Sequence, residues 1–271
     1  MSQGAEINNK IEEVDPIWNH AVLEAQRVSA EEPLLSAFME TAILSHKGLE
    51  QACAAHIALK LGNVEMSANA LRGLLEDTYL GNAGIGNAMR ADVLAIVERD
   101  PACQGYLDAV LYYKGFMALQ AYRAAHTLLL KGRRPVAMYI HNRASEVFQV
   151  DIHPAAIIGR GVLIDHATGV VIGETSVVGN NVSMLHSVTL GGNGKEKGDR
   201  HPKIGDGVLI SAGAKVLGNI KVGECSKIGG GSVVLEDIPP FSTAVGVPAK
   251  VVGTVSTNEP SRLMDHRIDD E

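Results

Sequence analysis

The sequence predicts an α+β protein, in which an N-terminal α-helical domain is followed by a parallel β-helix of hexapeptide repeats. Two observations predict this fold. Apolar residues recur at helical spacing from residue 15 to about residue 148, and they recur at every sixth residue after residue 150. The composition agrees, since 46% of the residues are hydrophobic but only 4% are aromatic. We therefore expect a helical domain over 1–148, a β-helix over 149–254 and a flexible C-terminal tail over 255–271.

The N-terminal half begins with a helix-capping signal. Asp15 precedes Pro16, which pairs an acceptor side chain with a residue whose φ is already helical. Prolines at positions 33, 101 and 135 fall where further helices should start or turns should occur. The apolar positions at helical spacing are Leu34, Leu35, Phe38, Leu44, Leu71, Leu74 and Leu75, followed by Phe116, Leu119 and Tyr122 on one side of an amphipathic helix over 115–130.

After residue 150 the apolar anchors fall six residues apart, a period that fits neither an α-helix nor an alternating strand. It is typical of a parallel β-helix in which each coil has three flat faces and each hexad forms one face. Glycine and asparagine supply the tight corners between the faces. The anchors are Ile152, Ile158, Ile164, Ile172, Val178, Met184, Leu190, Ile204, Ile210, Val216, Val222, Ile228 and Val234.

The six-residue register is interrupted twice. Two extra residues stand between Ile164 and Ile172, and a polar, glycine-rich loop stands between Leu190 and Ile204. The loop is too charged to lie inside the coil. Loops extruded from a rigid scaffold often carry function, although a tolerated insertion is the alternative.

The residues that could do acid–base chemistry lie at these interruptions. Asp165 precedes His166 at the first, and Arg200 with His201 ends the loop of the second. Asp151 is expected about one coil below His166, where a carboxylate could hold the imidazole tautomer and stabilise its protonated form. The other two histidines of this half, His153 and His186, are expected to be solvated residues at corners of the coil.

Several classes of protein are disfavoured. The formal net charge of −7 argues against nucleic acid as the main partner. Residues 1–13 are polar without the apolar core of a signal peptide, and no run approaches about 18 apolar residues, so no membrane span is expected. Cys53, Cys103 and Cys225 form no CxxC pair and are expected to be buried thiols in a reducing compartment. A cytoplasmic location follows from these features.

Several motifs together resemble the serine O-acetyltransferase family, whose members acetylate the serine hydroxyl with acetyl-CoA in cysteine biosynthesis. The likeness covers nearly the whole chain, and its Asp-His-Ala-Thr-Gly and Asp-Arg-His-Pro motifs are specific in combination. The motifs are FQVDIHP (148–154), LIDHATG (163–169), SVTLGG (187–192), GDRHPKI (198–204) and GVPAK (246–250), with ERDP (98–101), YKGF (113–116) and LQAYR (119–123) in the helical half.

The resemblance implies a left-handed coil, because the hexapeptide repeats of these acyltransferases wind that way. It also implies that His166 is the general base for the serine hydroxyl and that Asp151 orients it. The serine carboxylate would bind Arg200 and His201. Its ammonium group would meet the two acidic residues Asp100 and Asp165.

Acetyl-CoA is implied as a co-substrate, with no permanently bound cofactor and no metal. The residues expected along its groove are Gly192, Ala212, Lys227 and Lys250. Two departures from the family pattern fall in this region, Asn193 in place of Thr and Gly230 in place of Ala.

The resemblance also implies partners. The family's site lies between subunits of a homotrimer, two trimers pair through their helical domains, and cysteine inhibits by competing for the serine site. Relatives that bind O-acetylserine sulfhydrylase end in an isoleucine. This chain ends in three acidic residues after Ile268, so that complex is doubtful.

Three alternatives stand beside this interpretation. Another hexapeptide acyltransferase, with a sugar or a different amino acid as acceptor, would keep the base but lack the charges at Asp100 and Arg200. A zinc hydratase of the γ-carbonic anhydrase type would need three histidine ligands for each metal. A non-catalytic structural subunit is disfavoured by the presence of Asp151 and His166.

Overall fold

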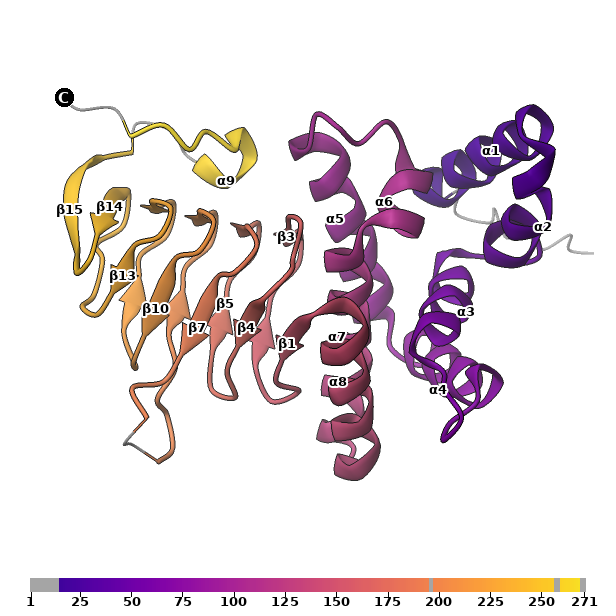
Figure 1. Ribbon diagram of the computed structural model, residues 1–271, viewed down its shortest axis with the longest axis horizontal. Helices are drawn as coiled ribbons and strands as arrows, with labels where there is room; N and C mark the ends of the chain where they lie inside the picture. The colour runs from indigo at the N-terminus through magenta and orange to yellow at the C-terminus, as the bar shows by residue number, and fades with distance from the viewer. Residues whose placement is uncertain (1–14, 195–196, 256–258, 269–271) are drawn as a thin grey trace, which may run out of the picture.

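The protein is an elongated molecule with helices at one end and a β-helix at the other (Figure 1). The computed structural model describes residues 15–194, 197–255 and 259–268. The expectations for residues 1–13 and for the acidic end at 269–271 lie outside the described residues.

The helical half begins at the predicted cap. Asp15 accepts a hydrogen bond from the amide of Trp18 at 3.3 Å, and Pro16 is the first helical residue, so the capping prediction is confirmed. The elements of this half are α1 (Pro16–Glu31), η1 (Pro33–Leu35), α2 (Ser36–Met39), η2 (Glu40–Leu44), α3 (Leu49–Leu61), α4 (Ala68–Leu80), α5 (Ala83–Arg99), α6 (Tyr106–Tyr112), α7 (Lys114–Leu130) and α8 (Arg134–Phe148).

Helix α7 is the predicted helix over 115–130, but it is not amphipathic. Phe116, Leu119 and Tyr122 are buried as expected, and so are residues on its other sides. The reason is its position, since α7 packs against α8 and α4 on one side and against the first strands of the β-helix on the other. Leu34 corrects a second expectation, because its side chain is 87% exposed instead of packed.

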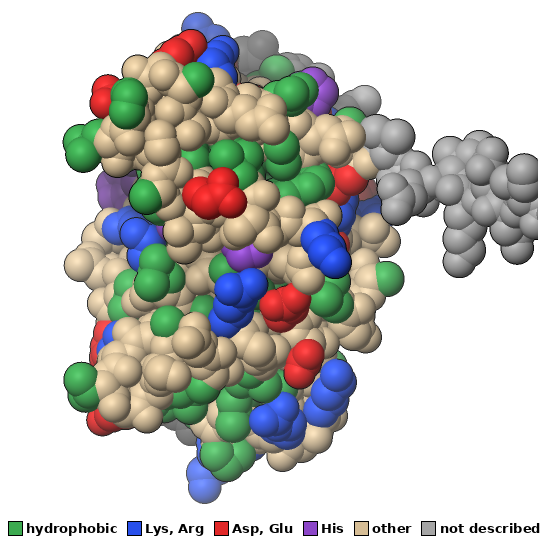
Figure 2. Space-filling model, turned by 90° about the vertical axis from the view of Figure 1, so that its right-hand side faces the viewer, with side chains coloured by type: hydrophobic (Ala, Val, Ile, Leu, Met, Phe, Trp, Pro, Cys, Tyr) green, Lys and Arg blue, Asp and Glu red, His purple; other side chains and the backbone are tan. Residues whose placement is uncertain are grey.

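The outer face of the helical half is chemically mixed. Figure 2 shows acidic, basic and apolar side chains interspersed over it, without a broad region of one charge. A nucleic-acid-binding face requires clustered Lys and Arg, which this face does not present. Among the described residues, no helix combines the length and the apolar character needed to cross a membrane.

The second half winds through three parallel sheets, one for each face of the coil. Their orders are β1-β4-β7-β10-β13, β2-β5-β8-β11 and β3-β6-β9-β12-β14-β15, in which only the β14–β15 pair is antiparallel. The strands are β1 (Val150–Ile152), β2 (Ile157–Ile158), β3 (Leu163–Ile164), β4 (Val170–Ile172), β5 (Val177–Val178), β6 (Ser183–Met184), β7 (Thr189–Gly191), β8 (Lys203–Ile204), β9 (Leu209–Ile210), β10 (Lys215–Leu217), β11 (Lys221–Val222), β12 (Lys227–Ile228), β13 (Val233–Val234), β14 (Ser242–Gly246) and β15 (Ala249–Thr254).

Every predicted anchor lies in one of these strands, so the hexad prediction is confirmed. The anchors stack directly, as when Ile152, Ile172 and Leu190 are register partners in turn. The first coil is longer than the rest, because Val150 pairs with Val170 across 20 residues. The two residues inserted after Ile164 account for this, and they shape the candidate site.

A buried ion pair joins the two halves. Arg123 of α7 donates to Asp92 of α5 at 2.7 Å, and both side chains are almost completely buried. Arg123 also donates to the carbonyl of Gly159, while Asp92 accepts from the amide of Val162 at 3.0 Å. Each charge thus reaches the β-helix backbone, which fixes α5 and α7 against the first coil.

The C-terminal segment lies back along the sheet that contains β6 and β9. Its helix α9 (Pro260–Leu263) contacts β9, and Ser183 donates to the carbonyl of Ser261 at 2.9 Å. Further along, Ser211 and His266 share a hydrogen bond of 2.8 Å. A flexible tail was expected from residue 255, and the structure instead gives residues 259–268 a packed position.

Candidate active site

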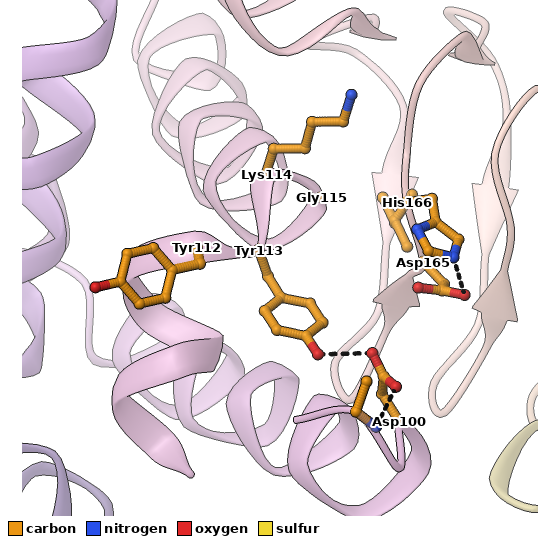
Figure 3. Close-up of a pocket in the computed structure, with 9 residues that line it drawn as sticks. Asp100, Tyr112, Tyr113, Lys114, Gly115, Asp165 and His166 are labelled. Carbon is orange, nitrogen blue, oxygen red and sulfur yellow. Dashed lines mark hydrogen bonds and ion pairs between the residues drawn. The ribbon is translucent and has the colours of Figure 1, made fainter. Parts of the chain in front are cut away.

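The first part of the candidate site is a cavity of about 330 Å³ between the helical half and the first coil (Figure 3). We call it the acceptor pocket. It brings together three of the residues predicted from the sequence, Asp100, Asp165 and His166. It is lined by Asp100, Ala102, Tyr112, Tyr113, Lys114, Gly115, Ile164, Asp165 and His166.

The first register interruption creates the corner that carries His166. His166 and Ala167 both have positive φ, at 55° and 58°. Non-glycine residues seldom adopt this region, and such conformations cluster at functional sites. The corner leaves the His166 side chain 74% exposed, with Nε2 3.6 Å from a carboxylate oxygen of Asp165. The imidazole therefore projects from a rigid coil with its nitrogens accessible.

Close packing of α7 holds this corner in place. A Cβ atom at Gly115 would lie 2.1 Å from the carbonyl oxygen of Ile164, so only glycine permits the helix to approach. The next side chain back, Lys114, donates a hydrogen bond to the hydroxyl of Thr168. The start of α7 is thereby tied to both sides of His166.

The two carboxylates of the acceptor pocket have different surroundings. Asp100 accepts a 2.6 Å hydrogen bond from the hydroxyl of Tyr113, and burial together with this bond raises the pKa of Tyr113. Burial raises the pKa of Asp165, and nearby His166 opposes that rise. Two carboxyl groups beside a cavity suit a cationic group of a small substrate.

A second group of titratable side chains lies at the next corner of the coil, and we call it the histidine–arginine cluster. Arg200 donates to Glu174 at 2.8 Å, and the His141 and His153 rings lie 5.8 Å apart. His153 and Glu174 also interact electrostatically. The cluster comprises His141, Asp151, His153, Glu174, Arg200 and His201.

The ring of His201 has a defined orientation. Its Nδ1 accepts from the amide of Thr175 at 3.1 Å, so the proton of the neutral ring lies on Nε2. Burial and neighbouring Arg200 lower its pKa, which favours that neutral form. A Cβ at Gly173 would lie 2.1 Å from this ring, so glycine makes room for it. His201 can therefore present a hydrogen-bond donor without carrying a charge.

The predicted stacking of Asp151 beneath His166 is wrong within one chain. Asp151 is the register partner of Val171 because the first coil has 20 residues instead of 18. Its carboxylate bonds His141 of α8, with Nε2 and Oδ1 2.6 Å apart. Among the described residues, no hydrogen bond, ion pair or ring contact joins the histidine–arginine cluster to the acceptor pocket.

The four residues expected to contact acetyl-CoA lie apart from each other. A Cβ at Gly192 would lie 3.4 Å from Arg200, and the carbonyl of Ala212 accepts from the amide of Gly231. Lys227 donates to the carbonyl of Arg267 in the C-terminal segment at 2.5 Å. Lys250 lies 3.5 Å from Glu236, and both side chains are exposed. Their shared role stays a prediction.

Comparisons with known proteins identify the chain's relatives. A family model described as serine acetyltransferase, N-terminal, matches residues 17–121, and one for six hexapeptide repeats matches 201–236. The serine acetyltransferase of Escherichia coli K12 is 49% identical over 257 residues, which cover 95% of this chain and 94% of that protein. The chain belongs to the serine acetyltransferase family. The resemblance found in the sequence is thus confirmed, and so is its activity class, an acyltransferase.

Solved serine acetyltransferases share the whole fold. The Brucella abortus enzyme in complex with coenzyme A has a TM-score of 0.89 and 49% identity over 91% of this chain and 99% of that one. Soybean serine acetyltransferase complexed with serine has a TM-score of 0.86 and 53% identity over 87% and 97%. A serine acetyltransferase complex with cysteine has a TM-score of 0.91 and 46% identity over 93% and 98%. The predicted fold class, with its left-handed β-helix, is confirmed, and the hydratase and structural-subunit alternatives are wrong.

Serine acetyltransferase motifs did not reveal every residue of the two groups. Tyr113 and Lys114 stand in a quoted motif, but the contacts that they make depend on how α7 meets the coil. His141 lies in a helix outside any motif, and only the tertiary structure brings it to Asp151. His186 was expected at a solvated corner, yet it is half-buried with its ring 5.9 Å from that of His166.

Proposed function

We propose that this serine acetyltransferase transfers the acetyl group of acetyl-CoA to the hydroxyl of L-serine, yielding O-acetyl-L-serine and CoA for cysteine biosynthesis. One observation carries the proposal: the acceptor pocket places an accessible imidazole, that of His166, beside the carboxylates of Asp100 and Asp165. The carboxylates suit the substrate ammonium. The imidazole suits deprotonation of the hydroxyl.

In the proposed reaction His166 takes the proton of the serine hydroxyl as its oxygen attacks the thioester carbonyl. A C–O bond forms, the C–S bond breaks, and the proton passes from the imidazole to the departing thiolate. A positioned base of this kind contributes about 10²–10⁴ in rate. The edge-on ring of His186 restricts the orientations open to His166.

The carboxylate of serine is proposed to bind Arg200 and His201. The guanidinium of Arg200 and the Nε2–H of His201 are donors of the kind that recognise a carboxylate. Since both belong to the histidine–arginine cluster, the complete site needs the acceptor pocket of one protomer and that cluster of another. We propose a homotrimer with its sites at the subunit boundaries, two of which pair into a hexamer through the helical halves.

The same arrangement gives Asp151 its partner. Its carboxylate, with 48% of the side chain exposed, is proposed to orient His166 of an adjacent protomer. Acetyl-CoA is proposed to lie near Gly192 and Ala212, with Lys227 and Lys250 at its phosphates. Lys227 would then exchange its bond to the Arg267 carbonyl for the co-substrate.

We further propose that L-cysteine inhibits the enzyme at the serine site and that the protein acts in the cytoplasm. Cysteine carries the same ammonium and carboxylate groups as serine, and a relative was solved with cysteine. Initial rates that do not change at millimolar cysteine would contradict this inhibition.

The decisive experiment measures thiol release from acetyl-CoA with L-serine, D-serine, threonine or a sugar as acceptor. Turnover is expected with L-serine, and His166→Ala should reduce it by at least about 100-fold. His20→Ala is the matched control, because His20 is an exposed histidine of α1. Turnover only with a sugar or another amino acid would favour the other hexapeptide acyltransferase and overturn the roles of Asp100 and Arg200.

A further inference from the structure

The contact between His141 and Asp151 links the helical half to the β-helix at a residue proposed to be catalytic. The Nε2–Oδ1 distance of 2.6 Å is short for a bond between a ring nitrogen and a carboxylate. The His141 side chain is only 15% exposed, whereas that of Asp151 is 48% exposed. The histidine is therefore the packed partner, and the carboxylate is the one that faces outward.

The position of His141 follows from how α8 meets β1. The helix ends at Phe148, and Gln149 adopts φ 58°, which turns the chain directly into the first strand. His141 stands about two turns before that end, so its side chain reaches Asp151 across the turn. Ile140 and Ala144 are buried on the same helix, which fixes its rotation. The ring is thus placed by a rigid element.

The hydrogen bond also sets the state of Asp151. Its pKa is lowered chiefly by the bond from His141, and secondarily by the nearby charges of His141 and His153. The other charged groups acting on His153 are Glu174 and Arg134. Since His141 occupies Oδ1, the second carboxylate oxygen, Oδ2, is left for another donor. The carboxylate is held ionised, with one oxygen engaged and one available.

We propose that His141 is a positioning residue, which holds Asp151 so that its second oxygen can orient the His166 base of an adjacent protomer. This inference rests on the proposed function. His141 itself touches neither substrate nor base. Its loss should therefore change the base and leave substrate binding as it is.

The test compares His141→Leu, which removes the donor, with His141→Gln, whose amide nitrogen can replace Nε2–H. Initial rates with L-serine and acetyl-CoA are measured from pH 5.5 to 9. His141→Leu is expected to lower kcat about tenfold, in keeping with a lost bond to a charged group, with KM for serine within about twofold. Because a poorly held carboxylate stabilises the imidazolium less, the acid limb of kcat/KM should move to lower pH. His141→Gln should restore both, and His20→Leu is the surface control.

Combining His141→Leu with Asp151→Asn separates positioning from folding. If His141 acts through Asp151, then His141→Leu has no further effect on kcat in the Asp151→Asn background. Three results would overturn the inference: independent, multiplicative losses in the double variant, an unmoved acid limb in His141→Leu, or a His141→Gln variant as impaired as His141→Leu. Absence of L-serine-dependent thiol release in the unsubstituted enzyme would instead contradict the proposed function.

Discussion

The hydroxyl of Tyr113 donates a 2.6 Å hydrogen bond to the Oδ2 of Asp100, across the floor of the acceptor pocket. Tyr113 stands between α6 and α7, and Asp100 directly follows α5. The bond therefore determines where the carboxylate points relative to the cavity, as Figure 3 shows. It makes the recognition of the ammonium group depend on a residue that is not itself charged.

We expect Tyr113→Phe to raise KM for L-serine about tenfold while kcat changes less. The lost bond to a charged group frees Asp100 to rotate, which weakens binding of the ammonium in the ground state. Steady-state kinetics with varied serine measure this effect. Tyr112→Phe is the control, since Tyr112 lines the same pocket with its ring directed away from Asp100 (Figure 3). Equal effects of the two substitutions would refute the proposed role.

Gly115→Ala should destabilise the protein by about 2 kcal/mol and reduce activity, because the added methyl would lie 2.1 Å from the carbonyl oxygen of Ile164. Relief of that clash moves either α7 or the corner that carries His166. Gly73→Ala is the matched control. It lies in α4 with no atom within 4 Å of the added methyl, and it should stabilise by about 0.5–1 kcal/mol. Urea unfolding and thiol-release assays measure both, and normal activity in Gly115→Ala would contradict the argument.

Asp92→Asn should cost about 3 kcal/mol or more in free energy of unfolding. The substitution leaves the guanidinium of Arg123 buried without its counter-charge, and breaking one partner of a buried pair is strongly destabilising. Arg72→Gln removes half of the exposed pair with Glu76 and should change stability by less than about 0.5 kcal/mol. Similar urea midpoints for the two variants would show that the buried pair is not what joins the two halves.

Stability should fall as the pH drops below about 6.5, the ordinary pKa of histidine. Burial lowers the pKa of His56, whose Nε2 donates to the carbonyl of Leu111 and whose Nδ1 has no partner among the described residues. Below 6.5 the unfolded chain therefore takes up a proton that the folded chain does not. The loss is at most about 1.4 kcal/mol for each pH unit, until the pH reaches the lowered pKa of the folded state.

His56→Gln isolates this contribution, because glutamine can keep the bond to Leu111 but does not titrate. The variant should show a shallower decline of unfolding free energy between pH 6.5 and 5.5 than the unsubstituted protein. Other histidines with lowered pKa, among them His153 and His201, are common to both proteins and cancel in the comparison. Parallel curves would exclude His56 as a source of the pH dependence.

The sequence predicted the β-helix almost completely, because its period is a local property. Each anchor such as Ile172 or Leu190 is buried by the equivalent residue of the next coil, so six-residue spacing specifies the stacking. The exposure of Leu34 was not predicted, since helical spacing alone does not show which face meets a neighbour. The burial of α7 on all sides was missed for the same reason.

The candidate site was predictable only where it is local. Asp165 and His166 are adjacent in the sequence and stay together at one corner. The position of Asp151 was wrong because a two-residue insertion lengthens the first coil, which shifts its partner to Val171. The bond from His141 depends on the direction of α8 after the chain turns, which no pattern of residue types encodes.

The antiparallel hairpin at the end of the coil has a consequence for growth of the assembly. A parallel β-helix exposes unpaired backbone groups at each end, and such edges can recruit another chain without limit. Here β15 folds back on β14 with a bulge at Thr243 and Ala244, while α8 packs over β1 at the opposite end. Both termini of the solenoid are thereby stoppered, so protomers can meet only flank to flank. The particle is confined to a closed, finite number of copies and is protected from becoming a fibre.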